Sequence, residues 1–342
     1  MRKIRVLVVE DSLVFRQLLV TNLNNDPAIE VVGVAGDPFE ARDLIIEKRP
    51  DVMTLDVELP RMNGIDFLRK LMPQYPLPVV VISALSDKVF DALHAGAVEF
   101  VNKPQVTDRK QLEYFLANDL PLKIKIASTA SLTNIKQKVA TNLGTVNRVS
   151  AKSTDKVIAI GASTGGTEAI AAVIAGFGPE IPGTVIVQHM PAGFTGMYAK
   201  RLDEKSRVAV REAKNGDRVE QGLVLIAPGG DAHMRLVKVG EGYQVEIKNG
   251  DKVNGHCPSV DVLFESVAKS AGSKAIGIIL TGMGGDGAKG LKKMRDAGAS
   301  TIGQDESTCV VYGMPKVAYD IGAVQFQEKL DNISKKTYSL LG

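Results

Sequence analysis

The sequence has little cysteine, little net charge and no long apolar run, and each of these absences narrows the class of protein. Two cysteines in 342 residues are too few for a disulfide framework, which suits a reducing compartment. The 42 basic and 39 acidic residues leave a net charge of +3, too small to indicate a nucleic-acid or membrane-surface partner. No stretch of about 20 apolar residues, the length of a transmembrane helix, occurs. The first residues lead into a strand pattern without a signal-peptide core, so we expect a cytoplasmic protein with no membrane insertion.

One glycine-rich stretch stands out among what the sequence does contain. Gly161-Ala162-Ser163-Thr164-Gly165-Gly166 follows the apolar residues 157–160, which predict a buried strand of a parallel sheet. Helical spacing of apolar residues at 167–174 then places Ser163 on a sharp turn from strand to helix. The pattern Gly-x-Ser-x-Gly is typical of a nucleophilic serine. A P-loop would need lysine at Thr167, and a dinucleotide fingerprint would need glycine at Ser163. A purely structural turn is the alternative.

Strand and helix patterns alternate through the first 120 residues. Apolar runs predict five strands, at residues 4–9, 31–35, 52–55, 79–82 and 98–101. This alternation predicts a flavodoxin-like, doubly wound parallel sheet with helices on both faces. We expect one domain over 1–120, a flexible linker rich in Ser, Thr, Asn and Lys over 121–155, and a second domain over 156–342.

Polar side chains follow the strands of the first sheet at their carboxyl ends. They are Glu10, Asp11, Asp56, Ser83 and Lys103. Side chains at these ends converge on one crevice. Three carboxylates there repel one another unless a cation intervenes, and hard oxygen ligands in a shallow site suit Mg²⁺. A metal and a lysine would stabilise phosphoryl transfer to a carboxylate, whereas the alternative is a set of unrelated, solvated acids.

The first domain resembles the receiver domain of two-component response regulators over its whole length. The matching segments are Val-Val-Glu-Asp-Ser at 8–12, Leu-Asp-Val-Glu-Leu-Pro-Arg-Met-Asn-Gly at 55–64, Ile-Ser-Ala at 82–84 and Asn-Lys-Pro at 102–104. The resemblance implies that Asp56 is the phosphoacceptor. It also implies that Mg²⁺ is held by Glu10, Asp11, Asp56 and the backbone carbonyl of Glu58.

The same resemblance implies a switch around the phosphoacceptor. Ser83 and Lys103 would contact the phosphoryl group, and Phe100 would be the aromatic switch residue. Glu10 departs from the family, which usually has aspartate there, but its longer side chain leaves a carboxylate within reach.

The second domain repeats the arrangement of polar residues after strands. The strand pattern at 185–187 ends near His189, and the pattern at 275–280 leads into a glycine-rich loop that contains Asp286. Further strands are expected at 224–227 and 301–303, with an antiparallel hairpin at 234–247. We expect a Rossmann-like α/β domain with a mostly parallel sheet, on whose edge Ser163, His189 and Asp286 converge.

These three residue types fit nucleophilic catalysis. A serine hydroxyl needs a neutral imidazole to take its proton, and the imidazole needs a carboxylate to fix its tautomer. Backbone N–H groups of the two glycine-rich loops would stabilise the oxyanion. An α/β-hydrolase is the rival, with the order serine, acid, histidine and with Asp231 and His256 as partners. A non-enzymatic output module that contacts DNA or another partner would predict a basic recognition helix or an aromatic cluster, and the second domain has neither.

Together these segments resemble the chemotaxis protein-glutamate methylesterase family, known as CheB. Beyond the receiver, the matching segments are Ile-Gly-Ala-Ser-Thr-Gly-Gly at 160–166, Val-Gln-His-Met-Pro at 187–191, Pro-Ser-Val-Asp-Val-Leu-Phe at 258–264 and Leu-Thr-Gly-Met-Gly-Gly-Asp-Gly at 280–287. The resemblance implies Ser163 as the nucleophile, His189 as the base and Asp286 as the orienting acid. It implies oxyanion donors at Met283 and Thr164, and no cofactor for the ester chemistry.

The resemblance also implies the partners. The substrate would be the γ-methyl ester of glutamate on methyl-accepting chemotaxis receptors, with methanol released, and some relatives also deamidate receptor glutamines. A chemotaxis histidine kinase would phosphorylate Asp56. Because a flexible connector joins a receiver to a hydrolase, we also expect the unphosphorylated receiver to obstruct the catalytic edge. No nucleic-acid partner is expected.

Overall fold

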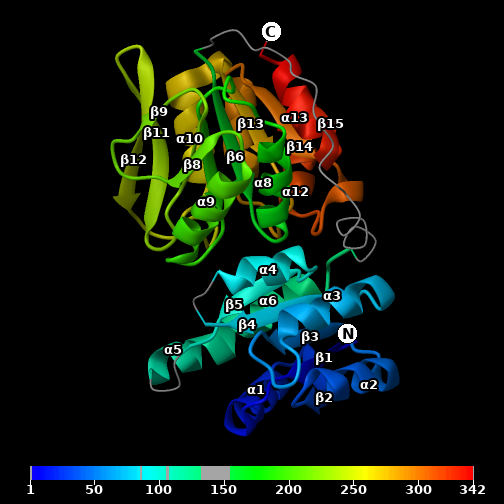
Figure 1. Ribbon diagram of the computed structural model, residues 1–342. Coiled ribbons are helices and arrows are strands. Elements are labelled where there is room, and N and C mark those ends of the chain that lie inside the picture. Colours follow the sequence, from blue (N-terminus) through cyan, green and yellow to red (C-terminus); the bar gives the residue numbers. More distant parts are fainter. Residues whose placement is uncertain (1, 85–86, 105–107, 132–154, 342) are drawn as a thin grey trace. The chain divides into compact units, whose positions relative to one another are not determined.

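The chain forms two compact units, one within residues 1–141 and the other within 142–342 (Figure 1). The computed structural model describes residues 2–84, 87–104, 108–131 and 155–341. Each unit contains a parallel sheet covered by helices, so the predicted α/β class is confirmed for both.

The N-terminal unit is a five-stranded parallel sheet in the order β2-β1-β3-β4-β5. Its strands are β1 (Ile4–Val9), β2 (Ile29–Ala35), β3 (Val52–Asp56), β4 (Val79–Ser83) and β5 (Glu99–Asn102). The chain moves from β1 to β2 in one direction and to β3 in the other, so the sheet has its switch point between β1 and β3. Crevices at such points receive the side chains that follow the strands.

Short polar side chains begin the helices of this unit. Ser12 accepts a hydrogen bond from the Phe15 N–H at the start of α1, and Asn63 accepts one from the Asp66 N–H at the start of α3. The helices are α1 (Leu13–Asn25), α2 (Pro38–Lys48), α3 (Gly64–Gln74), α4 (Lys88–His94), α5 (Arg109–Tyr114), the π-helical turn η1 (Phe115–Asp119) and α6 (Leu120–Ala127).

The helical segment at the end of this unit continues past the predicted domain boundary at residue 120. In α6, Leu120, Ile124 and Ala127 are fully buried, and the helix packs on β3, β4 and β5. The predicted linker is therefore wrong for its first residues: the apolar positions recur at helical spacing between exposed lysines and belong to the core. Residues 132–154 of the predicted linker lie outside the described residues.

The C-terminal unit is a seven-stranded parallel sheet in the order β15-β14-β13-β6-β7-β10-β8. Its strands are β6 (Val157–Ala162), β7 (Thr184–Gln188), β8 (Ala209–Glu212), β10 (Leu223–Ile226), β13 (Ala275–Ile279), β14 (Ser300–Gln304) and β15 (Phe326–Glu328). The chain runs from β6 to β7 on one side, and β13 lies on the other side of β6, so the switch point is at β6. The sequence did not predict β8 and β15, which are short edge strands with little apolar signal.

The helices of this unit cover both faces of the sheet (Figure 1). They are α8 (Gly166–Ala175), α9 (Phe194–Lys205), α10 (Val260–Ala271), the 3₁₀ turn η2 (Gly272–Lys274), α11 (Ala288–Asp296), the 3₁₀ turn η3 (Glu306–Thr308), α12 (Met314–Asp320) and α13 (Leu330–Ser339). Helix α10 packs against β6 on one side and against the hairpin strand β11 on the other. Within the described residues, no helix is both long and apolar enough to cross a membrane.

The predicted hairpin is confirmed as part of a separate antiparallel sheet in the order β11-β12-β9. Its strands are β9 (Arg218–Val219), β11 (Ala232–Val239) and β12 (Gly242–Asn249). Val239 pairs with Gly242 next to the turn, which fixes the register of the hairpin.

The turn between β6 and α8 requires glycine at position 166. A Cβ added to Gly166 would lie 2.1 Å from the Oε1 atom of Gln188 and 2.7 Å from the Cβ atom of Ala162. Both neighbours are buried, so neither can move without disturbing the sheet edge.

We expect Gly166→Ala to lower the free energy of unfolding of the C-terminal unit by about 1–3 kcal/mol, the usual cost of overpacking a core. Gly242→Ala is the matched control, because no atom lies within 4 Å of its added Cβ and its φ is ordinary. Denaturant unfolding of both variants tests this, and equal stability of the two would contradict the steric argument.

Candidate active site

Ser163 and His189 follow neighbouring strands at the switch point of the larger sheet. The last paired residues of β6 and β7 are Ala162 and Gln188. Ser163 and His189 therefore each come one position after the end of their strand. The His189 N–H donates to the Ala162 carbonyl at 3.1 Å, and the Ser163 N–H donates to the Thr281 carbonyl at 3.0 Å. Ser163 thus lies between the ends of β7 and β13.

Glycines shape the backbone around Ser163. Gly165 has a φ of 74°, and the Gly166 N–H donates to the Ser163 carbonyl at 2.7 Å, which closes the tight turn into α8. Across the sheet edge, a Cβ on Gly282 would lie only 2.7 Å from the Cβ of Ser163. The loop after β13 therefore approaches Ser163 because position 282 has no side chain.

His189 and Asp286 form a buried pair. The Nε2 atom of His189 lies 2.8 Å from the Oδ2 atom of Asp286, and their side chains are 7% and 1% exposed. The carboxylate can only accept here, so Nε2 carries the proton and Nδ1 is the basic atom. Nδ1 is buried and has no hydrogen-bond partner in the described part of the chain. The ring therefore presents a desolvated lone pair at the edge where Ser163 lies.

Asp286 is held on both oxygens by the segment that enters α10. Its Oδ1 accepts from Asn254 Nδ2 and from Ser259 Oγ, both at 2.8 Å, and its Oδ2 accepts from the Val260 N–H at 2.7 Å. Burial raises the pKa of Asp286, but the hydrogen bonds from His189, Asn254 and Val260 lower that pKa well below its usual range. Asp286 is therefore an ionised, fixed acceptor at neutral pH.

Gln188 is a site residue that the sequence reasoning did not assign. Its buried Nε2 donates to the carbonyls of Ser163 at 2.9 Å and of His189 at 3.1 Å. One amide thus joins the two strand ends. The only signal for it in the sequence is its place immediately before His189.

His256 lies flat on His189. The ring centroids are 3.7 Å apart and the planes differ by 10°. In the rival α/β-hydrolase arrangement, His256 is expected to be the base and Asp231 its acid. In the structure the buried carboxylate that meets a histidine is Asp286, and Asp231 is exposed.

The two predicted oxyanion donors lie on the loops beside Ser163. Thr164 is buried, and its carbonyl accepts from Thr281 Oγ1 at 3.0 Å. Met283 follows Gly282, and its backbone N–H donates to no other described residue. Their role as oxyanion donors stays a prediction.

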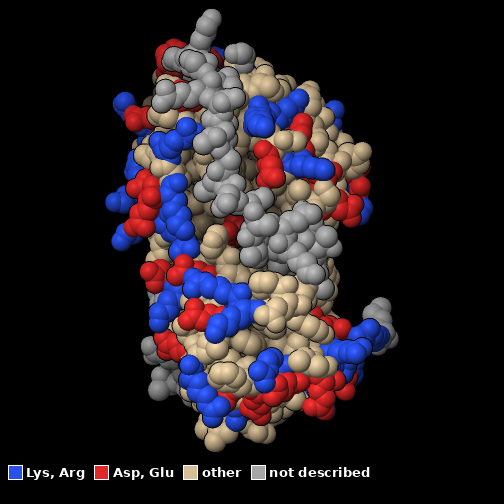
Figure 2. Space-filling view, turned by 45° about the vertical axis from the view of Figure 1, so that its right-hand side comes forward, with Lys and Arg blue, Asp and Glu red and all other residues tan. Residues whose placement is uncertain are grey.

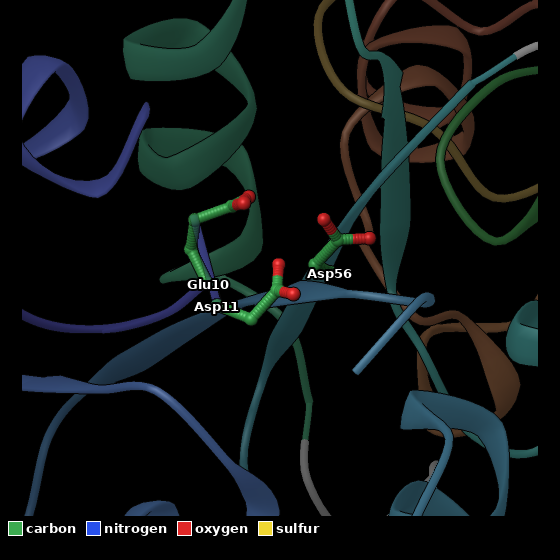
Figure 3. Close-up of side chains that lie close together, drawn as sticks. All are labelled: Glu10, Asp11 and Asp56. Carbon is green, nitrogen blue, oxygen red and sulfur yellow. The ribbon is translucent and has the colours of Figure 1, made fainter. Parts of the chain in front are cut away.

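A second polar cluster lies at the switch point of the N-terminal sheet. The carboxylates of Glu10, Asp11 and Asp56 point toward one another from the ends of β1 and β3, with ligand oxygens within 4.8 Å of each other (Figure 3). Glu10 is 1% exposed and Asp56 4%. Lys103 Nζ forms ion pairs with both, at 2.8 Å from Glu10 Oε2 and in short contact with Asp56 Oδ2.

The electrostatics of this cluster favour a cation. Burial, reinforced by the Asp56 charge, raises the pKa of Glu10 to about 7 although Lys103 opposes the shift. Burial lowers the pKa of Lys103. The hydrogen bonds of Lys103 to Asp56 and Glu10 raise its pKa by more, so the net shift is upward. The donor set is all oxygen and is crowded with negative charge, which fits Mg²⁺.

The remaining predicted receiver residues lie on β4, on β5 and in the loop after β3. Ser83 ends β4 and is buried, and its carbonyl accepts from the Lys103 N–H at 2.7 Å. Phe100 is buried on β5. The Glu58 N–H donates to Asp56 Oδ1 at 2.9 Å. Carbonyl ligation by Glu58 and the switch role of Phe100 stay predictions.

We expect Lys103→Met to lower the thermal stability of the N-terminal unit by several degrees, because it leaves buried carboxylates without their cation. Millimolar Mg²⁺ should stabilise this variant more than the unmutated protein, since a cation bound only to the folded state replaces the lost charge. Calorimetry with Mg²⁺ or EDTA measures both effects, and exposed Lys70→Met is the control. Equal Mg²⁺ responses in all three proteins would contradict this assignment.

These two units define a class: a response regulator whose receiver precedes an α/β domain with a serine, histidine and aspartate at one sheet edge. The response regulator receiver domain model matches residues 6–114, and the CheB methylesterase model matches residues 158–337. The chain belongs to the CheB methylesterase family.

Full-length relatives agree with this assignment. The protein-glutamate methylesterase/protein-glutamine glutaminase 2 of Syntrophomonas wolfei is 59% identical over 341 residues, covering 100% of this chain and 98% of the relative. The protein-glutamate methylesterase/protein-glutamine glutaminase of Syntrophotalea carbinolica is 54% identical over 99% of this chain and 98% of its own length. The crystal structure of the Thermotoga maritima CheB methylesterase catalytic domain, 39% identical, matches with a TM-score of 0.53 over 55% of this chain and 99% of that one.

Proposed function

We propose that the C-terminal unit hydrolyses γ-methyl esters of glutamate on the cytoplasmic domains of chemotaxis receptors and releases methanol. The observation that carries this proposal is the buried pair of His189 and Asp286, which leaves the basic Nδ1 atom unpartnered beside the strand end that carries Ser163. Names of full-length relatives supply the substrate class.

The chemistry follows from the tautomer that Asp286 imposes. Nδ1 of His189 takes the proton of Ser163 Oγ as this oxygen attacks the ester carbonyl. Asp286 stabilises the imidazolium that forms, and Nδ1 then delivers the proton to the departing methanol. Water repeats the sequence on the acyl-enzyme and frees the glutamate and Ser163.

The oxyanion of each tetrahedral intermediate needs donors on the side of the glycine-rich loops. The Met283 and Thr164 N–H groups are the donors we propose, each contributing roughly 3 kcal/mol by analogy with other serine hydrolases. Hydrolysis of a glutamine side chain uses the same steps with ammonia as the leaving group, so we propose deamidation as a second activity, in keeping with the relatives' names.

The N-terminal unit is proposed to control this activity. Asp56 is the phosphoacceptor, and a chemotaxis histidine kinase is its phosphoryl donor. Receiver domains use Mg²⁺ for this transfer. Glu10, Asp11, Asp56 and the Glu58 carbonyl would hold it here, and it would neutralise phosphoryl charge. We propose that Ser83, Lys103 and Phe100 respond to the phosphoryl group, and that the unphosphorylated receiver hinders access of the receptor.

A cytoplasmic location is part of this proposal, because the receptor domain and the kinase are cytoplasmic. A nucleic-acid output is the alternative that the face drawn in Figure 2 disfavours. Basic and acidic side chains are interspersed over the described surface in Figure 2, whereas a DNA-binding face gathers charge of one sign.

We expect the phosphorylated protein to release methanol from methylated receptor membranes, and Ser163→Ala to abolish the release. A fluorophosphonate probe should label Ser163 in the unmutated protein, and His189→Ala should slow labelling at least a hundredfold because the base is lost. Mass spectrometry locates the label. Ester hydrolysis that persists in Ser163→Ala would contradict this mechanism.

We expect a small phosphoryl donor with Mg²⁺ to raise ester hydrolysis by the full-length protein, and Asp56→Asn to remove the response. The fragment 154–342 should be faster than the unphosphorylated whole, because it lacks the receiver. Methanol release by the three proteins measures this. A fragment no faster than the unphosphorylated whole would refute obstruction by the receiver.

A further inference from the structure

The ring of His256 stacks on His189, but the mechanism proposed for Ser163, His189 and Asp286 gives this ring no role. We propose that His256 is a positioning residue that holds the imidazole of His189 in the plane in which Nδ1 faces Ser163. This inference rests on the proposed function, since it concerns the base of that reaction.

A single hydrogen bond does not fix the orientation of the His189 ring. The ring is attached to the chain at Cγ and is bonded to Asp286 at Nε2, which lies across the ring from Cγ. Rotation about the Cβ–Cγ bond moves Nδ1 farther than Nε2, because Nδ1 lies farther from the rotation axis, so the hydrogen bond at Nε2 restrains the position of Nδ1 only in part. A flat group packed on one face of the ring blocks this rotation, and the His256 ring is parallel to it within 10° at a centroid distance of 3.7 Å.

His256 ends a tight backbone turn that fixes the position of its ring. Val253 and His256 each donate a backbone N–H to the other's carbonyl at 3.0 Å, which closes a tight turn. Asn254, inside this turn, has a φ of 53°, a conformation that asparagine tolerates better than most residues.

The same turn is fastened to the acid that binds His189. Asn254 Nδ2 donates to Asp286 Oδ1 at 2.8 Å and to Asp261 Oδ2 at 2.7 Å. Beyond the turn, Ser259 Oγ also bonds to Asp286. Asp286 therefore anchors both histidines. It bonds directly to the ring of His189, and through Asn254 it holds the turn that carries His256.

A positioning role differs from a chemical role in what can replace the residue. A base or proton carrier needs a ring nitrogen, whereas a flat support needs only an aromatic face. Phenylalanine should therefore substitute for His256, and leucine, which fills similar space without a flat ring, should not.

The experiment compares His256→Phe and His256→Leu in the full-length, phosphorylated protein, with the exposed loop residue Lys252→Ala as control. We expect His256→Leu to lower kcat about tenfold with KM within twofold, the effect of losing one stacked ring contact. His256→Phe and Lys252→Ala should stay within about threefold of the unmutated protein. Thermal unfolding of each variant establishes that it is folded.

The rate of Ser163 labelling by a fluorophosphonate should follow the same order, because it depends on the base and not on the receptor. Full activity in His256→Leu, or equal loss in His256→Phe and His256→Leu, would overturn the positioning role. If the unmutated protein releases no methanol from receptors but the labelling order holds, the proposed substrate is wrong and the positioning role stands.

Discussion

The hydrogen bond between His189 and Asp286 is the interaction on which the proposed chemistry of the C-terminal unit depends. It joins the end of β7 to the loop after β13, two segments about a hundred residues apart that flank β6 in the sheet. The bond fixes which nitrogen of His189 carries the proton, and therefore which nitrogen is basic. Because the pair is buried, water competes poorly for either partner, and Nδ1, which has no hydrogen-bond partner in the described part of the chain, keeps the lone pair that the proposed mechanism requires.

The cost of burying an ionised carboxylate explains the neighbourhood of Asp286. An isolated charge in this position would be protonated, so the chain surrounds it with donors from Asn254, Ser259 and Val260 in addition to His189. These donors come from the segment that leads into α10. The segment therefore belongs to the structure that holds Asp286 in place.

Both units place their polar side chains at the same kind of position, the switch point of a parallel sheet, but the two sets of side chains differ in chemistry. In each, acidic or nucleophilic side chains follow strands at the switch point of a parallel sheet, where the chain leaves a crevice between outgoing loops. In the N-terminal unit the crevice buries Glu10 beside Asp56, and this burial, reinforced by the Asp56 charge, raises the pKa of Glu10 to about 7. In the C-terminal unit the crevice brings a carboxylate to a histidine and lowers the pKa of Asp286, which prepares it to orient a base.

The sequence by itself determined the α/β class, most strands of both sheets, the placement of Ser163, His189 and Asp56 at strand ends, and that of Asp286 in the loop after a strand. These features follow from local patterns, namely apolar runs, glycine-rich turns and the polar residue after each strand. Only the tertiary structure decided that α6 belongs to the first core, that Gln188 joins two strand ends, and that His256 packs on His189. Those contacts join residues from separate segments or depend on packing of an amphipathic face, and no local pattern records which partner a histidine or an amide will meet.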